Sequence, residues 1–367
     1  MNLQRPLAML RKEFLHIVRD PRSLGLALAM PVLLLLLFSY ALSLDVDKIP
    51  TYILDHDQTD VSRELIAQFA GSRYFTILGY SKDYQSIEKS IGLNECLLAV
   101  VIPKDFARDV AARRPQSIQL LLDGTDSNTA SIARNYAESV VSSWAASQFH
   151  VKAAIETRPR VWYNSTLESR NFIVPGLISV ILMIISALLT SLTVAREWET
   201  GTLEQLLSTP LRSGEIIIGK LGAFFILGVA DAIIALTVGV LVFHVPFRGS
   251  LLFLGISTAV FLVGAFSWGL FLSSIAESQL QAFQLGMLSS FLPAFLLSGF
   301  IYAIENMPAP IQVATYLFPS RYFISILKAS FLKGLGFADL WPQLGALIIY
   351  TIAVTTLAMR RMRTKVA

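Results

Sequence analysis

Charged side chains, cysteine and histidine are all scarce in this 367-residue sequence. Asp, Glu, Lys and Arg make up 15% of the residues, against about a quarter in a soluble globular protein, whose surface must face water. Hydrophobic residues make up 54%, and the mean hydropathy is +0.59. This composition excludes a soluble globular protein. Gly and Pro occur in ordinary amounts, 21 and 15 residues, which excludes collagen-like and disordered chains.

The single cysteine, Cys96, excludes an intrachain disulfide. Cys96 lies in an apolar run, which favours an inert buried thiol over a reactive one. The four histidines lie far apart, and no Cys or His pair has the spacing of metal ligands. We interpret Asp55-His56-Asp57 as a solvated turn rather than a metal or acid-base site. The sequence therefore predicts no metal site and no catalytic residue.

The sequence contains several long apolar stretches with few or no charges. A helix needs about 20 apolar residues to cross the roughly 30 Å hydrocarbon layer of a membrane. Six stretches meet this requirement, at residues 23–44, 172–195, 221–243, 251–276, 282–302 and 341–359. The predicted fold class is an α-helical polytopic membrane protein with six transmembrane helices and an inserted α/β extracytoplasmic domain.

Two of the apolar segments need a separate interpretation. Residues 23–44 could be a secretory signal peptide, but their uncharged run exceeds the 7 to 15 residues typical of a signal core, which favours a retained anchor. Residues 303–340 are interrupted by Pro308, Pro310 and Pro319. Irregular backbone at membrane depth persists where protein covers it, so we expect an outer re-entrant hairpin here.

Residues 45–170 differ from the rest of the chain, because they contain 30 of its 56 charged side chains. Short apolar runs alternate there with helical patterns, which predicts a small α/β domain with a parallel or mixed sheet. Residues 1–22 then form a cytoplasmic amphipathic helix, residues 23–44 the first span, and residues 171–367 the other five.

The basic residues near the span ends predict the orientation. With both termini in the cytoplasm, twelve Lys and Arg residues near span ends lie inside and four lie in short outer connections. Residues 45–170 are then extracytoplasmic. This bias also explains the sequence pI of about 9.1 without a nucleic-acid partner.

No energy source is evident in the chain itself. The segment from Gly214 to Lys220 matches GxxxxGK, but Leu221 follows where Ser or Thr must bind magnesium, and no strand precedes it. We interpret this segment as the entrance of a membrane helix. Asp231 is the one charge well inside a confident span, and either a functional or a packing role remains open for it.

Two amphipathic patterns lie outside the spans. The first places apolar residues opposite Arg11, Lys12 and Arg19, as expected for a helix along the inner membrane surface; its apolar residues are Leu7, Leu10, Phe14, Ile17 and Val18. The second lies at residues 202–208, within the cytoplasmic connection 196–220. Such a short helix can lie on the membrane or dock in a partner's groove.

Three segments resemble permease subunits of type 2 ABC exporters: RKEFLHIVRDPRSL, AREWETGTLEQLLSTPLRSGEIIIGKL and FLPAFLLSGFIYAIENMPAPIQVATYLFPSRYFISILKASFLKG. VVIPKDFARDV and LLDGTDSNTA resemble the multidrug-efflux subgroup, which has a large extracytoplasmic domain between its first two spans. The resemblance covers nearly the whole chain and keeps its order and spacing.

The resemblance implies half of a transporter in the bacterial inner membrane, paired with a second permease subunit that is identical or related. Cytoplasmic ABC ATPase subunits would bind the ATP and Mg²⁺, so this chain would hold no cofactor and would not itself be an enzyme. Carried over by position, the ATPase-coupling residues are Arg196, Glu197, Glu199, Gly201, Thr202, Leu203, Glu204, Leu206 and Leu207. Efflux relatives often use a periplasmic adaptor protein, which the outer domain would dock.

The resemblance also implies an outer gate at the hairpin. Its expected residues are Pro293, Ser298, Gly299, Phe300, Pro319, Arg321 and Tyr322. The implied function is ATP-driven export of amphipathic compounds, such as drugs or lipid-like molecules. The alternative is a receptor or sensor with a ligand-binding outer domain, although its cytoplasmic parts lack a signalling domain. A membrane-embedded enzyme ranks third, because neither GxSxG nor HExxH is present.

Overall fold

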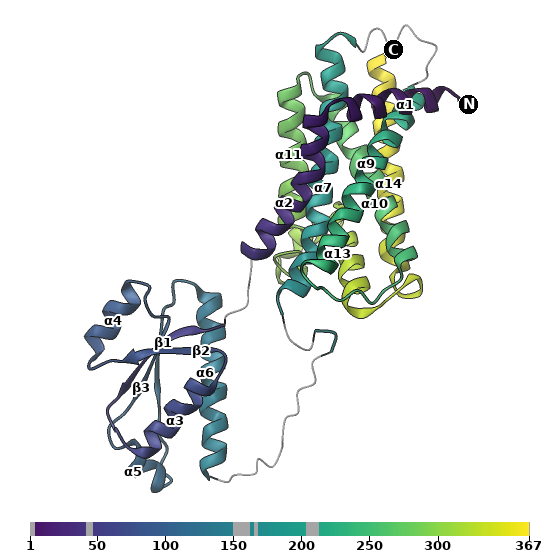
Figure 1. The fold of residues 1–367 in the computed structure, drawn as a ribbon. Coiled ribbons are helices and arrows are strands. Elements are labelled where there is room, and N and C mark those ends of the chain that lie inside the picture. Colours follow the sequence, from purple (N-terminus) through teal and green to yellow (C-terminus); the bar gives the residue numbers. More distant parts are fainter. Residues whose placement is uncertain (1–3, 42–46, 150–161, 165–167, 203–212, 367) are drawn as a thin grey trace. The chain divides into compact units, whose positions relative to one another are not determined.

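The computed structural model describes residues 4–41, 47–149, 162–164, 168–202 and 213–366. The chain divides into two compact units (Figure 1). Residues 44–160 form the first, which we call the sheet unit. Residues 1–43 and 161–367 together form the second, the helical unit.

The sheet unit contains a mixed sheet. Its described strands are β1 (Ile49–Asp55), β2 (Phe75–Tyr80), β3 (Leu98–Ile102) and β4 (Gln119–Leu122). They lie in the order β2-β1-β3-β4. β1 pairs in parallel with both β2 and β3, whereas β4 runs antiparallel to β3.

Helices cover both faces of this sheet. They are α3 (Asp60–Gly71), α4 (Tyr84–Gly92), α5 (Phe106–Ala111) and α6 (Ser127–Phe149). Side chains of β3 alternate between two cores, as a strand's period of two requires: Val100 packs in the cluster that contains Phe69 of α3 and Trp144 of α6, and Val101 packs with Ile87 of α4. Every residue of β3 is therefore buried.

Local sequence chemistry sets the helix starts in the sheet unit. Thr59 caps α3, since its Oγ1 accepts a hydrogen bond from the backbone N–H of Ser62 at 3.3 Å. Asp83 caps α4 in the same way, at 2.8 Å from the N–H of Ser86. Asp55 Oδ1 accepts hydrogen bonds from the N–H groups of Asp57 and Gln58, which stabilises the turn predicted there.

The helical unit is built from long apolar helices. Their bounds are α1 (Gln4–Arg19), α2 (Pro21–Ala41), α7 (Arg170–Glu199), α9 (Ser213–Leu241), α10 (Leu251–Ile275), α11 (Gln279–Leu296) and α14 (Phe337–Val366). Between α11 and α14 lie the short elements η1 (Ile304–Asn306), α12 (Ala309–Thr315), α13 (Pro319–Lys328) and the π-helical η2 (Ala329–Lys333).

Four of the described helices are long and apolar enough to cross a membrane: 170–199, 214–241, 251–275 and 337–362. They coincide with the second, third, fourth and sixth predicted spans. The first predicted span forms α2, whose apolar part, Ala27–Ala41, is shorter. The fifth forms α11, of 18 residues, which is not one of the four. The chain is thus a mostly helical polytopic membrane protein.

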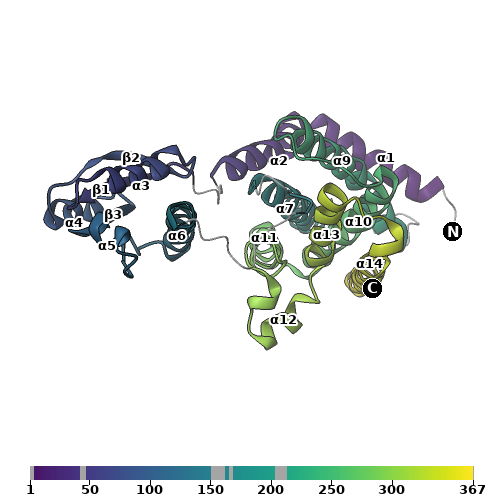
Figure 2. The ribbon, with the colours of Figure 1, turned by 90° about the horizontal axis from the view of Figure 1, so that it is seen from below.

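Helix α7 lies at the centre of the helical unit, with α2, α9, α11 and α13 around it when the unit is viewed from one end (Figure 2). Its most apolar window is 72% buried, against 22% in α14. Small residues allow this close packing: Gly286 of α11 lies against Ser191 of α7, and Gly269 of α10 lies against Ala187 and Thr190.

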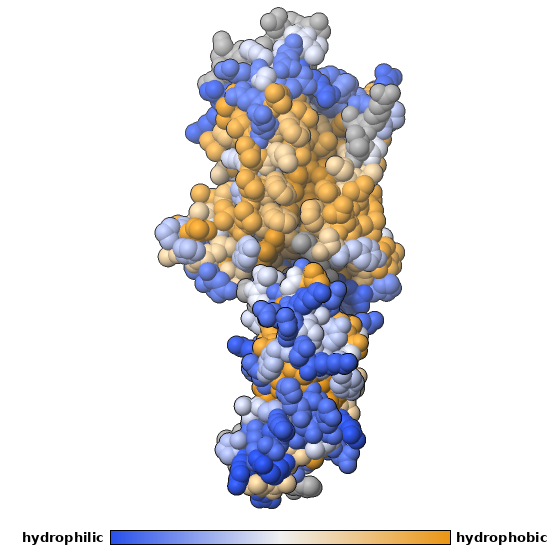
Figure 3. Space-filling view, turned by 90° about the vertical axis from the view of Figure 1, so that its left-hand side faces the viewer, coloured by the Kyte–Doolittle hydropathy of each residue, from blue (hydrophilic) through white to orange (hydrophobic). Residues whose placement is uncertain are grey.

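The outer surface of the helical unit has the distribution expected of a membrane protein. An apolar band covers its middle, and hydrophilic side chains gather at its ends (Figure 3). Large apolar side chains are exposed on several of its helices, among them Leu33, Ile233, Leu252, Leu288 and Ile349. Hydrocarbon rather than water is the solvent that suits such a surface.

Candidate functional site

The described coupling residues lie at the carboxyl end of α7. This helix ends where Gly201 takes a left-handed backbone conformation, with φ of +68°, which glycine adopts at little cost. The N–H of Gly201 bonds to the carbonyl of Trp198 at 3.2 Å. Thr202 Oγ1 lies 3.0 Å from Thr200 Oγ1. The predicted coupling residues Leu203, Glu204, Leu206 and Leu207 lie outside the described residues.

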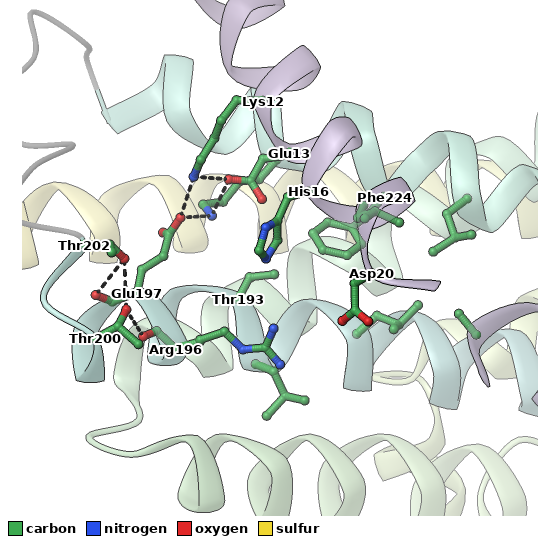
Figure 4. A pocket seen from close by; sticks show the side chains of 16 residues that line it. Lys12, Glu13, His16, Asp20, Thr193, Arg196, Glu197, Thr200, Thr202 and Phe224 are labelled. Carbon is green, nitrogen blue, oxygen red and sulfur yellow. Dashed lines mark hydrogen bonds and ion pairs between the residues drawn. The ribbon is translucent and has the colours of Figure 1, made fainter. Parts of the chain in front are cut away.

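Glu197 is buried within the helical unit and takes part in a cluster of ion pairs (Figure 4). Its Oε1 accepts from Lys220 Nζ of α9 at 2.8 Å and from Lys12 Nζ of α1 at 3.2 Å. The same two ammonium groups contact Glu13 Oε1 of α1, at 3.2 and 2.8 Å. We call these four residues the ion cluster. It joins the coupling end of α7 to both α1 and α9.

Burial makes the ion cluster energetically important. The Lys220 side chain is 1% exposed and that of Glu13 is 5% exposed. A charge removed from water is tolerated only when it is paired, and loss of one partner from a buried pair costs about 3–5 kcal/mol. Lys12 is half-exposed, so its pairs are weaker. Lys220 is therefore the central cation of the cluster.

Ion pairing outweighs burial in its effect on the pKa of Glu13. Burial acts to raise this pKa, but the charges of Lys220 and Lys12 together outweigh burial, so that the pKa lies below its ordinary value of 4.5. The pKa of Lys12 is raised above 10.5, because its contacts with Glu13 and Glu197 outweigh the opposite effect of burial. Both residues are charged near neutral pH.

Glycines bring α1 close to α9. A Cβ on Gly219 would lie 2.6 Å from Cβ of Met9, and one on Gly222 would lie 2.6 Å from Cδ1 of Leu10. The GxxxxGK segment thus forms the first turns of α9, which confirms its interpretation as a helix entrance. Its last glycine packs against α1, and its lysine is the centre of the ion cluster.

The structure corrects the predicted apolar stripe of α1. Leu7, Phe14 and Val18 are exposed, as a membrane-facing stripe requires. Leu10 and Ile17 instead pack inward, against α9 and the core of the helical unit. The helix is amphipathic, but its inward stripe also includes Pro6, Met9 and Glu13, and the sequence period alone does not separate the two faces.

Glu199 fixes the coupling end of α7 to a further helix. Its Oε1 accepts the backbone N–H of Gln279, the first residue of α11, at 2.7 Å. The side-chain amide of Gln279 also donates to Glu199 Oε2 at 2.5 Å, and Arg196 Nε donates to Gln279 Oε1 at 3.4 Å. Glu197 and Glu199, two residues apart on α7, therefore contact different helices: Glu197 contacts α1 and α9, and Glu199 contacts α11.

A cavity of about 660 Å³ adjoins the ion cluster (Figure 4). Residues of α1, α2, α7 and α9 line it. Glu13 and Glu197 lie at one end of it, and Phe224 lies at the other, with the Asp20 carboxylate beside it (Figure 4). Asp231 lies farther along α9 and is buried, and its Oδ1 has no hydrogen-bond partner among the described residues.

The predicted gate residues lie around the break after α11. Pro293 lies inside α11, and the Ser298 hydroxyl bonds to the carbonyl of Ala294. Gly299 has φ of +79°, which turns the chain. Phe300 is buried and lies directly on Gly176 of α7, where a Cβ would overlap its ring.

The other gate residues join α12 to α13. Pro319 begins α13, where a missing N–H has no cost. The Arg321 guanidinium lies 3.7 Å from the ring centroid of Tyr316 and donates to Thr315 Oγ1. Tyr322 Oη donates to the Tyr316 carbonyl at 2.9 Å. These contacts stabilise the turn between the two short helices.

Lys328 is a residue of this region that the sequence did not indicate. Its Nζ donates to the carbonyl of Gly299 at 3.1 Å and lies 3.6 Å from the ring centroid of Phe172. It thereby joins α13, the break after α11 and the start of α7. Within the described ranges, no group of three or more His, Cys, Asp or Glu residues could hold a metal ion.

Comparison with known proteins places this architecture in a family. Residues 22–360 match the sequence profile described as ABC-2 family transporter protein. The "Probable multidrug ABC transporter permease YbhS" of Escherichia coli (strain K12) is 36% identical over 340 residues, which cover 91% of this chain and 90% of the relative. The "Probable multidrug ABC transporter permease YbhR" of the same strain is 35% identical over 361 residues, 98% of each chain. The "Inner membrane transport permease YhhJ" is 28% identical over 328 residues. This chain therefore belongs to the ABC-2 family of transporter proteins.

Proposed function

We propose that this chain is the permease half of an ATP-driven exporter of amphipathic compounds. A separate ATPase subunit hydrolyses ATP, and the segment 196–207 docks on it. The observation that carries this proposal is the ion cluster, because Glu197, at the start of this segment and the end of α7, pairs with Lys220 inside the helical unit. Movement imposed on the segment reaches α9 and α1 through buried contacts.

The contacts around α7 support a mechanical link. The coupling end has ion pairs to α1 and α9 and hydrogen bonds to α11, and the far end of α7 contacts the hairpin through Phe172 and Gly176. α7 is a continuous helix of 30 residues. ATP-driven closure of the ATPase pair would bias this helix between two arrangements, inward- and outward-facing.

The proposed topology has six membrane crossings, with both termini in the cytoplasm and the sheet unit outside. α2 and α11 supply the two crossings beyond the four long helices. The basic residues near span ends support this orientation. Two permease subunits, identical or related, would form the pathway, and the sheet unit would dock a periplasmic adaptor.

Association with an ATPase is the first test. We expect Leu206→Asp to leave the protein in the membrane and to abolish its copurification with a coexpressed ATPase subunit, because an acid at an apolar position of the predicted amphipathic helix 202–208 opposes burial in a groove. Leu78→Asp, at an exposed position of the sheet unit, is the matched control. Full association of the Leu206→Asp protein would contradict the proposed docking segment.

A further inference from the structure

Asp231 is a buried acid that the proposed coupling does not use. It lies in α9, ten residues from the nearer end of the apolar segment 214–241, and is 2% exposed. Its Oδ1 is buried and has no hydrogen-bond partner among the described residues. The preceding turn of α9 is in apolar surroundings, since Gly228 lies against Phe266 and Leu262 of α10. The acid therefore lies within the apolar part of the helical unit.

The helices packed around α9 place their charged groups away from Asp231. α10 contains no titratable residue, and α1 meets α9 at Gly219 and Gly222, at the end that contains the ion cluster. In the middle of α14, Tyr350 lies against Gly264 of α10. The other titratable residues of α2, α7 and α14 lie near the helix ends: Arg22, Tyr40, Arg170, Arg196, Glu197, Glu199, Asp339, Arg360, Arg361, Arg363 and Lys365. On α9 itself, Lys220 lies eleven positions earlier, about 16 Å along the axis.

These surroundings determine the protonation state of Asp231. An ionised carboxylate that is buried without a partner is so costly that the group takes up a proton instead. Asp231 is therefore a neutral carboxylic acid in this arrangement of the helices. Its exposure of 2% leaves no room beside it for a larger cation. A metal ion would need further ligands, and the described residues contain no group of three or more His, Cys, Asp or Glu that could supply them. The cation that fits this site is a proton.

The cavity beside the ion cluster ends close to this acid. Lys220, Phe224 and Leu227 of α9 line the cavity. Asp231 continues this series, and the spacings of four, three and four residues place all four side chains on one face of the helix. Because Cα–Cβ bonds tilt toward the amino end of a helix, Asp231 is directed back toward the turn of Leu227. About one turn of helix, about 5.4 Å, separates the acid from the cavity.

We propose that Asp231 is a proton-binding site, which holds a proton in the arrangement described here and releases it into the cavity in the other arrangement of the transport cycle. In that second arrangement the cavity extends past Leu227 and water reaches the carboxyl. The O–H bond of the acid breaks, and the proton passes to a water molecule. An aspartic acid in water ionises near about pH 3.9, so a hydrated carboxyl gives up its proton at neutral pH. The inference rests on the proposed function for the existence of the second arrangement.

Infrared spectroscopy of the purified full chain in maltoside micelles, without an ATPase, tests the bound proton. A protonated carboxyl has a C=O stretching band that is separate from the bands of carboxylates. We expect this band in the natural chain at neutral pH and its loss in Asp231→Asn, whose amide has nearly the same shape. Asp339→Asn, at an exposed acid of α14, is the matched control and should keep the band. Thermal unfolding verifies that each variant is folded. Identical spectra of the natural chain and folded Asp231→Asn would overturn the proposal.

Proton counting with a pH-sensitive dye tests the release. The full chain is mixed with its ATPase subunit and a non-hydrolysable ATP analogue, so that ATP hydrolysis contributes no protons. We expect the natural chain to release about one proton more per chain than Asp231→Asn does, and Asp339→Asn to behave like the natural chain. Equal release from the natural chain and Asp231→Asn would overturn the proposal. Failure of the proposed function would instead appear as lost copurification of the natural chain with the ATPase, while the infrared band, which needs no ATPase, would remain.

Discussion

Lys220 of α9 and Glu197 of α7 form an ion pair, 2.8 Å from Nζ to Oε1, in which both residues are more than nine-tenths buried. The two residues are 23 positions apart: Glu197 lies at the start of the segment 196–207 proposed to dock the ATPase, and Lys220 lies beyond its end. The pair therefore closes that segment at its base. Glu13 of α1 shares the lysine at 3.2 Å, so the N-terminal helix belongs to the same structure.

Loss of the central cation should be severely destabilising. Lys220→Met leaves the buried Glu13 and Glu197 carboxylates with the half-exposed Lys12 alone, at an expected cost of about 3–5 kcal/mol. The measurement is thermal unfolding in detergent. Lys89→Met, at an exposed lysine of α4, should unfold like the natural chain. The double variant Lys220→Met/Glu13→Gln should recover part of the loss, since it removes a buried charge. An unchanged melting temperature in Lys220→Met would refute a buried cation at this position.

Acid should weaken the attachment of α1. The folded-state pKa of Glu13 is lowered from 4.5, so its contribution to stability is present above that value and is lost as the pH falls through the folded pKa. We expect the melting temperature to drop on acidification below about pH 4.5, by less in Glu13→Gln than in the natural chain. Identical pH profiles for the two proteins would show that Glu13 contributes nothing.

Alkaline pH should remove the contribution of Lys12 to stability, as acidic pH removes that of Glu13. Its folded-state pKa is raised above 10.5, so its contribution is present below that pH and is lost as the pH rises through the folded value. Because this side chain is half-exposed, we expect a smaller effect than that of Glu13. Lys12→Met measured between neutral and alkaline pH gives the comparison.

Two glycine-to-alanine substitutions should have opposite effects on stability, because only one of them lies at the contact between α1 and α9. Gly219→Ala places a Cβ 2.6 Å from Met9 and should destabilise the protein by about 1–3 kcal/mol. Gly345→Ala, in the interior of α14 with nothing within 4 Å, should stabilise it by about 0.5–1 kcal/mol. The measurement is thermal unfolding of both variants and of the natural chain under the same conditions. Stabilisation by Gly219→Ala would contradict the packing of α1 on α9.

Lys328 should restrain the hairpin. Lys328→Met loses the hydrogen bond to Gly299 and the contact with Phe172, so we expect a cysteine introduced by Ser298→Cys to react with maleimide at least about threefold faster. The background carries Cys96→Ala, since Cys96 is the only natural thiol. Lys333→Met, at an exposed lysine of η2, is the matched control. Equal labelling rates in the two lysine variants would assign no restraint to Lys328.

Sequence patterns predicted much of the fold because the forces involved are local. The alternation of short apolar runs with helical patterns in residues 45–170 and the apolar lengths of α7, α9 and α10 all reflect neighbours within a few residues. The strand order could not be predicted from the sequence, because β1 pairs with β3 across more than 40 residues and no local pattern encodes that pairing.

The candidate site was only partly predictable for the same reason. Glu197 follows from position in the family, but its burial depends on α1 and α9 meeting it. Glu13, four residues after Met9 and four before Ile17, stood on the inward stripe of α1, and an acid on such a stripe signals a buried cation. Lys328 bonds to Gly299 across 29 residues, so its role required the hairpin's geometry.

The most direct test of the account measures molecules transported per ATP hydrolysed, in proteoliposomes that contain this chain and its ATPase. Glu197→Gln keeps the shape of the side chain but removes its charge, and Glu277→Gln changes an exposed acid outside the ion cluster. We predict that Glu197→Gln retains ATPase binding and hydrolysis while the transported ratio falls about tenfold, and that Glu277→Gln keeps the natural ratio. A natural ratio in Glu197→Gln would contradict coupling through the ion cluster.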